Sequence, residues 1–192
     1  MNLRAFTGAV LGFVWAFMPS GGALASDNLH LIERLPNGFE IYRTSKPDRA
    51  AMRDLCERGV TEMVVLSGNA ESHEYEHIEE CPQLKVVLNI EQDEKEPLTA
   101  DFLRTFTDWV ETARATGKKI AFRCNCGCHR TGRLAAFYQM KWQNMTGHDA
   151  IAIMHAYGRN MWLHPWLDKQ VWGLQAYVKG VECPMKPKYC VQ

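Results

Sequence analysis

The sequence predicts a single α/β domain whose central, mostly parallel sheet is flanked by helices. Short apolar segments typical of buried strands alternate with longer segments whose apolar residues recur at helical spacing. The 192 residues suit one domain with one core, and 46% apolar with 23% charged residues is typical of a globular protein. Because the strands alternate with helices, we expect helices on both faces of the sheet.

The first 25 residues have the layout of a secretory signal peptide. Arg4 precedes an apolar run over residues 5–18, and residues 23–25 read Ala-Leu-Ala, a small-x-small cleavage pattern. The alternative is an N-terminal membrane anchor, but the run is shorter than the ~20 residues that a membrane span requires. We therefore expect cleavage, and a mature protein that is periplasmic or secreted and not attached to a membrane.

The remaining residues divide into a folded domain over 26–180 and an irregular tail over 181–192 that contains two prolines. The chain has 22 basic and 22 acidic residues, so its formal net charge is zero. A neutral balance gives no support to bulk electrostatic binding of nucleic acid or of anionic membranes. We expect no nucleic-acid partner, and a monomer.

The first half of the domain predicts three strands and one helix. An apolar-polar alternation over 39–43 indicates the first strand. A helix is expected over 49–58, and Gly59 ends it. The apolar runs over 63–66 and 86–90 are typical of buried strands.

The second half predicts one strand and four helices. Apolar residues at helical spacing predict a helix over 98–116, and the segment 118–123 is the last expected strand. Further helices are expected over 131–145, 148–157 and 165–179.

The segment that carries the chemistry is KKIAFRCNCGCHRTGRL, residues 118–134. A strand that leads through a tight loop into a helix N-terminus builds an anion site from inward-facing backbone N–H groups and the helix dipole. Cys124 and Arg130 are spaced as Cys-x5-Arg, and the planar guanidinium of Arg130 can clamp two phosphate oxygens. Such a site predicts that the pKa of the Cys124 thiol lies below ~8.5, which gives a thiolate nucleophile.

These residues resemble a known family. Residues 124–133 are similar to the signature loop C-x-x-G-x-x-R-[ST]-G of the protein tyrosine phosphatase superfamily. Residues 42–47, YRTSKP, resemble the Y-R-S-x-x-P segment of compact dual-specificity phosphatases, and Asp93 with Pro97 resembles the mobile acid loop of the family. The resemblance covers roughly residues 38–178 and implies a dual-specificity-phosphatase-like fold.

The resemblance implies a role for each residue of the site. Cys124 would attack phosphorus to form a phosphocysteine, and Thr131 would donate to its sulfur. Asp93 would protonate the leaving oxygen and then take a proton from water. No metal and no other cofactor is implied, because amides and guanidinium supply the positive charge. The implied phosphate-binding residues are Asn125, Cys126, Gly127, Cys128, His129 and Arg130.

Two features depart from the family pattern. Arg123 stands where most members carry His before the nucleophile, which puts the hydrogen-bond support of the thiolate in doubt. Cys126 and Cys128 are extra thiols in the loop: they either fill space or form a reversible bond with Cys124 that shields it from overoxidation. The acid assignment also has rivals nearby, which are Glu91, Glu94 and Glu96.

Two other residue patterns could indicate metal sites, but neither matches a known metal motif in its full context. Cys124, Cys126, Cys128 and His129 lack the two separated pairs of a structural zinc site, and their spacing does not match the haem motif C-x-x-C-H. Residues 73–77 satisfy the zinc-protease pattern H-E-x-x-H, but the flanking residues are acidic and a solvated face is the simpler interpretation. His155 and His164 are interpreted as packing or surface residues rather than ligands.

The cysteine count is seven, so at least one thiol is left over if the others pair. Cys183 and Cys190 flank a proline-bearing tail segment, and we expect a disulfide between them. Cys56 and Cys81 lie between adjacent strand–helix units and form a weaker candidate for a second pair.

The expected function is hydrolysis of phosphomonoesters on a phosphotyrosine-type protein or an inositol polyphosphate. Five residues could surround the pocket with positive charge, which would favour a multiply phosphorylated small molecule: Arg43, Lys46, Lys95, His129 and Arg133. Two alternatives stay open, which are a phosphate-binding module without turnover and an H-E-x-x-H zinc hydrolase.

Overall fold

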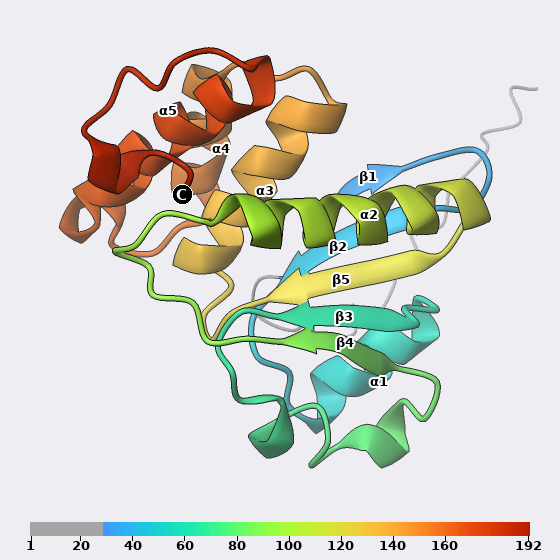
Figure 1. Ribbon diagram of the computed structural model, residues 1–192. Helices are drawn as coiled ribbons and strands as arrows, with labels where there is room; N and C mark the ends of the chain where they lie inside the picture. The colour runs from blue at the N-terminus through green and yellow to red at the C-terminus, as the bar shows by residue number, and fades with distance from the viewer. Residues whose placement is uncertain (1–28) are drawn as a thin grey trace, which may run out of the picture.

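The computed structural model describes residues 29–192, so the predicted signal peptide lies outside the described residues. The sheet has five strands in the order β1-β2-β5-β3-β4 (Figure 1). Strand β1 runs antiparallel to β2, and the other neighbours are parallel. The strands are β1 (His30–Arg34), β2 (Glu40–Thr44), β3 (Glu62–Val65), β4 (Lys85–Asn89) and β5 (Lys119–Arg123).

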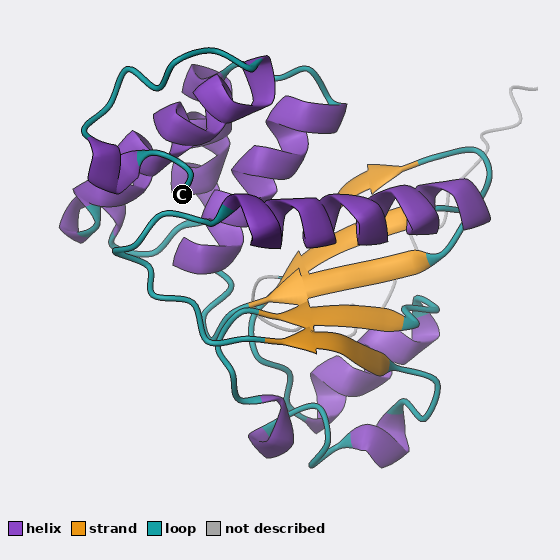
Figure 2. Cartoon of the chain, viewed as in Figure 1, coloured by secondary structure: helices purple, strands orange, loops and turns teal. Residues whose placement is uncertain are grey.

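The helices cover both faces of this sheet (Figure 2). They are α1 (Arg49–Glu57), α2 (Ala100–Thr116), α3 (His129–Trp142), α4 (Gly147–Tyr157) and α5 (Pro165–Lys179). Short 3-10 helices lie at Ala70–Ser72, Ile78–Glu80, Met161–Leu163 and Pro187–Tyr189. The predicted α/β fold with a mostly parallel sheet is therefore confirmed. Among the described helices, none is long and apolar enough to cross a membrane.

Alternating side chains of the strands divide the core into two clusters. In β5, Ile120 and Phe122 belong to the larger cluster, which α2, α3, α4 and α5 complete. Ala121 between them belongs to the smaller cluster, into which α1 places Met52 and Leu55. This period of two follows from strand geometry and fixes which helices cover which face.

The carboxyl ends of the four parallel strands meet at one edge of the sheet (Figure 1). The loop after β5 carries the predicted signature motif, and the segment after β4 carries the predicted acid. Ligands of open α/β sheets bind at this edge, so the fold brings the two candidate segments to one place.

Several sequence-based boundaries need correction. Strand β1 was not predicted at all. Helix α2 begins at Ala100, because the side chain of Thr99 caps it by accepting from the backbone N–H of Phe102 at 3.2 Å. Helix α3 begins at His129, two residues before the predicted start, and ends at Trp142.

The tail is less irregular than expected. The disulfide between Cys183 and Cys190 is present, as predicted. A 3-10 helix lies between these two cysteines. The backbone N–H of Ala100 donates to the carbonyl oxygen of Gln192, and this hydrogen bond holds the C-terminal residue against the start of α2. Cys56 and Cys81 are reduced thiols, so the second predicted pair is wrong for this structure.

Candidate active site

The signature loop, residues 124–130, connects β5 to α3 and rests on the end of β2. Gly127 has φ +67°, and a Cβ added there would lie 2.7 Å from the carbonyl oxygen of Thr44. Only glycine fits such a position without strain. The buried Arg43 donates from Nη2 to the carbonyl oxygen of Gly127 at 2.7 Å. The loop is therefore held from below by strand β2.

The candidate nucleophile Cys124 lies at the base of this loop and is 1% exposed. A hydrogen bond with the Cys126 thiol and burial together raise the pKa of Cys124 to about 12. Thr131 opposes them, because its hydroxyl and backbone N–H lower this pKa. The sequence-based expectation of a lowered pKa is thus wrong for this state of the loop, in which the neighbouring thiol and burial outweigh the anion cradle.

The lowered thiol pKa of the loop belongs to Cys128 instead. Hydrogen bonding with Cys126, with help from the charge and backbone of Arg159, lowers the pKa of Cys128 to about 7. The backbone N–H of Cys128 also donates to Sγ of Cys126 at 3.1 Å. All three loop cysteines are reduced, so the proposed shielding disulfide with Cys124 is not formed in this structure.

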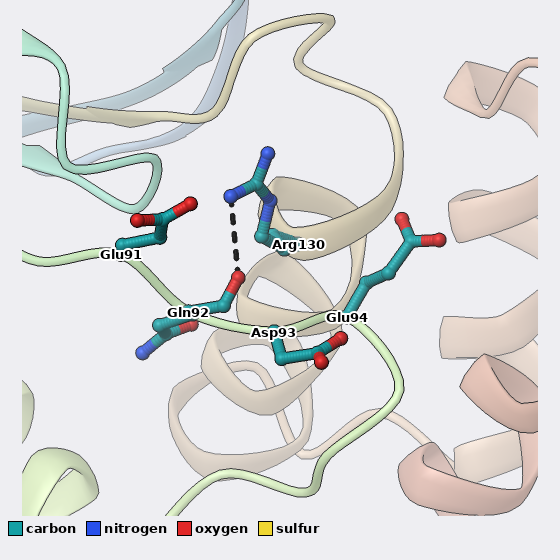
Figure 3. A pocket seen from close by; sticks show the side chains of 5 residues that line it. All are labelled: Glu91, Gln92, Asp93, Glu94 and Arg130. Carbon is teal, nitrogen blue, oxygen red and sulfur yellow. Dashed lines mark hydrogen bonds between the residues drawn. The ribbon is translucent and has the colours of Figure 1, made fainter.

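Arg130 and the acid loop, residues 91–97 after β4, form one cavity of about 470 Å³ (Figure 3). Nη1 of Arg130 donates to the carbonyl oxygens of Leu66 at 3.1 Å and Gln92 at 3.2 Å. The cavity is lined by Glu91, Gln92, Asp93, Glu94 and Arg130. The structure therefore brings the predicted acid Asp93 and the predicted phosphate clamp together.

Of the rival acids, Glu91 and Glu94 line this cavity and Glu96 does not. The Asp93 side chain is exposed, and its Oδ1 accepts from the backbone N–H of Lys95 at 2.8 Å. Glu94 is turned toward two histidines instead, since its Oε1 lies 2.9 Å from Nδ1 of His164. Asp93 is thus less engaged with other side chains than Glu94.

Two residues expected at the pocket rim are buried beneath it, which corrects the sequence analysis. Arg133 is 0% exposed and donates to backbone carbonyls of the acid loop, including that of Glu96, and to Oε1 of Gln170. Burial lowers the pKa of Arg133 to about 10. Arg43 is likewise buried. Arg133 therefore supports the acid loop from inside, while Lys46 and Lys95 stay exposed.

Arg123, which replaces the family histidine, belongs to a buried ion pair. Its guanidinium contacts both oxygens of Glu74, with Nε to Oε1 at 2.6 Å, and neither side chain is exposed. Nη1 also donates to Ser67 and Asn69, each at 2.7 Å. Nδ2 of Asn69 in turn donates to Oδ1 of Asn125 in the signature loop at 2.9 Å. The pair thus anchors one side of the loop.

The same ion pair removes the zinc-protease hypothesis. Glu74 would be the general base of H-E-x-x-H, but it is fully buried against Arg123. His73 and His77 lie in turns between two 3-10 helices of three residues each. They therefore do not share the helix face that the motif needs to hold zinc.

The described part of the chain contains one group of side chains with the composition of a metal site, and the sequence analysis missed it. The ligand atoms of Glu94, His129 and His164 all lie within 4.8 Å of one another. The other histidine interpreted as packing, His155, instead bonds Asp168 at 2.7 Å. No sequence signal joins Glu94 to the two histidines, because they come from three separate segments.

Comparison with known protein families gives a match. The family model described as "Dual specificity phosphatase, catalytic domain" matches residues 48–171, well over half of the chain. A sequence comparison with curated proteins gives no match.

Solved structures share the fold at low sequence identity. TpbA of P. aeruginosa is 19% identical with a TM-score of 0.58, over 85% of this chain and 93% of that chain. The catalytic core of the PP-IP phosphatase SIW14 of S. cerevisiae is 16% identical with a TM-score of 0.58, over 84% of this chain and 89% of that chain. PTPMT1 is 15% identical with a TM-score of 0.59, over 79% and 96%.

Proposed function

The chain belongs to the dual-specificity phosphatase family, and we propose that it hydrolyses phosphomonoesters through a covalent phosphocysteine on Cys124. As a member of this family, it is a phosphoric monoester hydrolase. The observation that carries the mechanism is the shared cavity of Arg130 and Asp93 beside the loop on which Cys124 lies. A nucleophile, an oxyanion clamp and a proton donor are the three groups that this reaction needs.

The reaction follows from these positions in two steps. The Cys124 thiolate attacks phosphorus and forms a sulfur–phosphorus bond, while the bond to the leaving oxygen breaks and Asp93 gives that oxygen its proton. Water then attacks phosphorus, Asp93 takes back a proton, and the sulfur leaves as thiolate. Thr131, which lowers the pKa of Cys124, stabilises the sulfur in both steps.

Arg130 must change partners for this reaction. In the structure its Nη1 bonds two backbone carbonyls, which are neutral acceptors. Phosphate oxygens are charged acceptors, and charge-assisted bidentate bonds are roughly twice as strong. We expect the guanidinium to turn from Leu66 and Gln92 to the bound phosphate, together with the backbone N–H groups of the signature loop.

Replacement of the nucleophile tests the covalent mechanism. We expect Cys124→Ser to abolish turnover of an aryl phosphate while phosphate binding, measured by calorimetry, is kept, because amides and Arg130 make the anion site. Cys56→Ser is the matched control, a cysteine outside the loop, and should keep full activity. Turnover by Cys124→Ser would contradict the covalent mechanism, and a wild type that binds phosphate without turnover would favour the phosphate-binding alternative.

The acid assignment predicts a difference between leaving groups. An alkoxide leaves with difficulty unless it is protonated, and general acid help is worth about 10²–10⁴-fold. We expect Asp93→Asn to lose about this factor in kcat on an alkyl phosphate and much less on an activated aryl phosphate. Glu96→Gln, outside the cavity, is the control. Equal losses of Asp93→Asn on both substrates would show that Asp93 is not the acid, and Glu91 and Glu94 would be tested next.

Between the two substrate classes, we favour a phosphotyrosine-type substrate over an inositol polyphosphate. Three carboxylates, those of Glu91, Asp93 and Glu94, line the cavity beside the single cation Arg130. Additional phosphate groups would meet these like charges, since the expected cation Arg133 is buried. Among the structural neighbours, TpbA has been solved in complex with pTyr, and SIW14 is a PP-IP phosphatase. Initial rates on a phosphotyrosine peptide and on inositol hexakisphosphate distinguish the two classes.

We further propose that the protein is exported. The signal-peptide layout of residues 1–25 motivates this, and the disulfide of Cys183 with Cys190 supports it, since disulfides persist in oxidising compartments. N-terminal sequencing of protein from the extracytoplasmic fraction should show cleavage after Ala25. An uncleaved chain in that fraction would instead indicate an anchor.

A further inference from the structure

Beside the phosphate site, one carboxylate faces two histidines. Nδ1 of His164 lies 2.9 Å from Oε1 of Glu94, and Nδ1 of His129 lies 3.3 Å from Oε2. The two imidazole rings lie close together, with centroids 3.7 Å apart and planes tilted by 31°. The three side chains are each less than a third exposed. Two ring nitrogens and a carboxylate thus converge in a half-enclosed place.

The hydrogen bonds of His129 define which nitrogen is available. Its Nε2 lies 2.8 Å from the backbone carbonyl oxygen of Arg159. A carbonyl only accepts, so Nε2 carries the hydrogen, and in the neutral ring Nδ1 presents its lone pair to Glu94. A lone pair and a carboxylate repel each other unless a cation lies between them. Metal-bound histidines characteristically donate their other N–H to a backbone carbonyl in this way.

Neighbouring residues hold His164 and Glu94 in position. His164 packs its ring edge-to-face against Trp166, with centroids 5.2 Å apart. The backbone carbonyl of Glu94 accepts from Nε2 of Gln170 at 3.2 Å and from the buried Arg133 at 3.4 Å. Both the histidine and the acidic residue are therefore held in place by neighbours, as ligands of a preformed site need to be.

We propose that Glu94, His129 and His164 bind a divalent transition-metal cation, with Zn²⁺ as the best fit. Imidazole nitrogen and carboxylate oxygen are the ligands that Zn²⁺ accepts, and three protein ligands leave a fourth tetrahedral position for water. The cation replaces the proton that would otherwise be required between Glu94 and His129. This site does not rest on the proposed hydrolysis, because binding needs none of the catalytic steps.

The three ligands come from three segments of the chain, so a bound cation would link them. Glu94 belongs to the acid loop, His129 to the signature loop, and His164 to the residues just before α5. Asp93 and Arg130 are the immediate chain neighbours of two ligands. An occupied site would therefore fix the acid loop against the signature loop beside the cavity that Glu94 lines.

Metal titration of the mature chain, residues 26–192 with the disulfide of Cys183 and Cys190 intact, tests this proposal. We expect one Zn²⁺ per chain, measured by competition with a chromophoric chelator, and a rise of the melting temperature with Zn²⁺. His164→Ala and Glu94→Gln should each lower the affinity by tenfold or more and remove most of the rise. His155→Ala is the matched control, because His155 also bonds a carboxylate but lacks a second histidine, and it should behave as wild type.

A Co²⁺ spectrum separates this site from the cysteines of the signature loop. Ligation by nitrogen and oxygen gives d–d bands without a sulfur-to-cobalt charge-transfer band. We expect the d–d bands to vanish in His164→Ala. A charge-transfer band that persists in His164→Ala would place the metal on the thiols and overturn the proposal. Unchanged Zn²⁺ affinity in both His164→Ala and Glu94→Gln would overturn it equally. Loss of binding without loss of secondary structure by circular dichroism supports it.

Discussion

Two buried arginines lie beneath the signature loop, and their surroundings differ sharply. Arg43 and Arg123 come from the neighbouring parallel strands β2 and β5, at the same carboxyl edge. Arg123 forms a bidentate ion pair with Glu74 and two further hydrogen bonds. Arg43 donates from Nη2 to Gly127, while its Nε and Nη1 have no hydrogen-bond partner among the described residues. One cation is neutralised, and the other is not.

The difference indicates separate roles for the two charges. Burial lowers the pKa of Arg43 to about 10, and the nearby thiols, Cys124 first among them, act in the opposite direction. Arg43 thus stays charged at neutral pH, with the Tyr157 ring 4.9 Å from its guanidinium carbon. A buried cation without a carboxylate partner favours an anion nearby, and Cys124 is the thiol with the largest effect on the pKa of Arg43. We therefore expect Arg43, and not Arg123, to be the buried cation that stabilises the Cys124 thiolate when that thiolate forms.

The largest expected effect comes from breaking the neutral pair. Glu74→Ala leaves the charge of Arg123 buried and uncompensated, which typically costs about 3–5 kcal/mol. We expect the free energy of unfolding, measured in urea, to fall by this amount. Glu76→Ala, an exposed glutamate two residues away, is the control and should change it by less than ~0.5 kcal/mol. A small effect of Glu74→Ala would mean that water reaches Arg123 and that the pair is not structural.

For Arg43, which has no carboxylate partner, we expect the opposite result, a small loss of stability and a clear loss of activity. Arg43→Met removes a buried charge without leaving a carboxylate behind, so the loss of stability should be well below that of Glu74→Ala. Loss of the cation should raise the pKa of Cys124 by about one unit. At pH values below that pKa, the fraction of thiolate, and with it kcat/KM, should then fall about tenfold. Arg123→Met is the matched variant, and it should destabilise as much as Glu74→Ala. A large loss of stability in Arg43→Met with unchanged kcat/KM would reverse the assignment.

The elements that the sequence predicted well are those whose signals are local. The central strands and all five helices follow from apolar runs and helical spacing, and the signature loop was recognisable from residues 124–133. Strand β1 was missed because its five residues become a strand only by pairing with β2. Asn37-Gly38 before β2 is a hairpin-turn signal that could have indicated it, and Gly38 has φ +95°.

The partners of the site's charged residues were not predictable in the same way. Glu74 lies in an acidic segment, and nothing local distinguishes it from its exposed neighbours, yet it pairs with Arg123 forty-nine positions later. Arg133 looks like a surface cation of the helix start, but α3 buries it against the acid loop. Such contacts depend on how distant segments are packed together, which residue type and spacing do not encode.

The smallest expected effect concerns Cys126, the thiol that is hydrogen-bonded to the candidate nucleophile Cys124. The hydrogen bond between Cys124 and Cys126 keeps the proton on Cys124 and so raises the pKa of Cys124. In Cys126→Ala that bond is gone, and the pKa of Cys124 should fall. A hydrogen bond of this kind is worth about 1 kcal/mol, so alkylation of Cys124 at a fixed pH below its pKa should speed up about fivefold.

The rate is best followed by mass spectrometry of the peptide that contains Cys124, as a function of pH, since other thiols also react. Cys126 is only half-buried, so the truncation should leave the fold intact. Cys56→Ala is the control and should leave the pH profile unchanged. The shift should run opposite to that of Arg43→Met, because one change removes a group that holds the proton and the other removes a group that favours its loss. A profile of Cys126→Ala that moves to higher pH would show that Cys126 donates to the thiolate rather than accepting from the thiol.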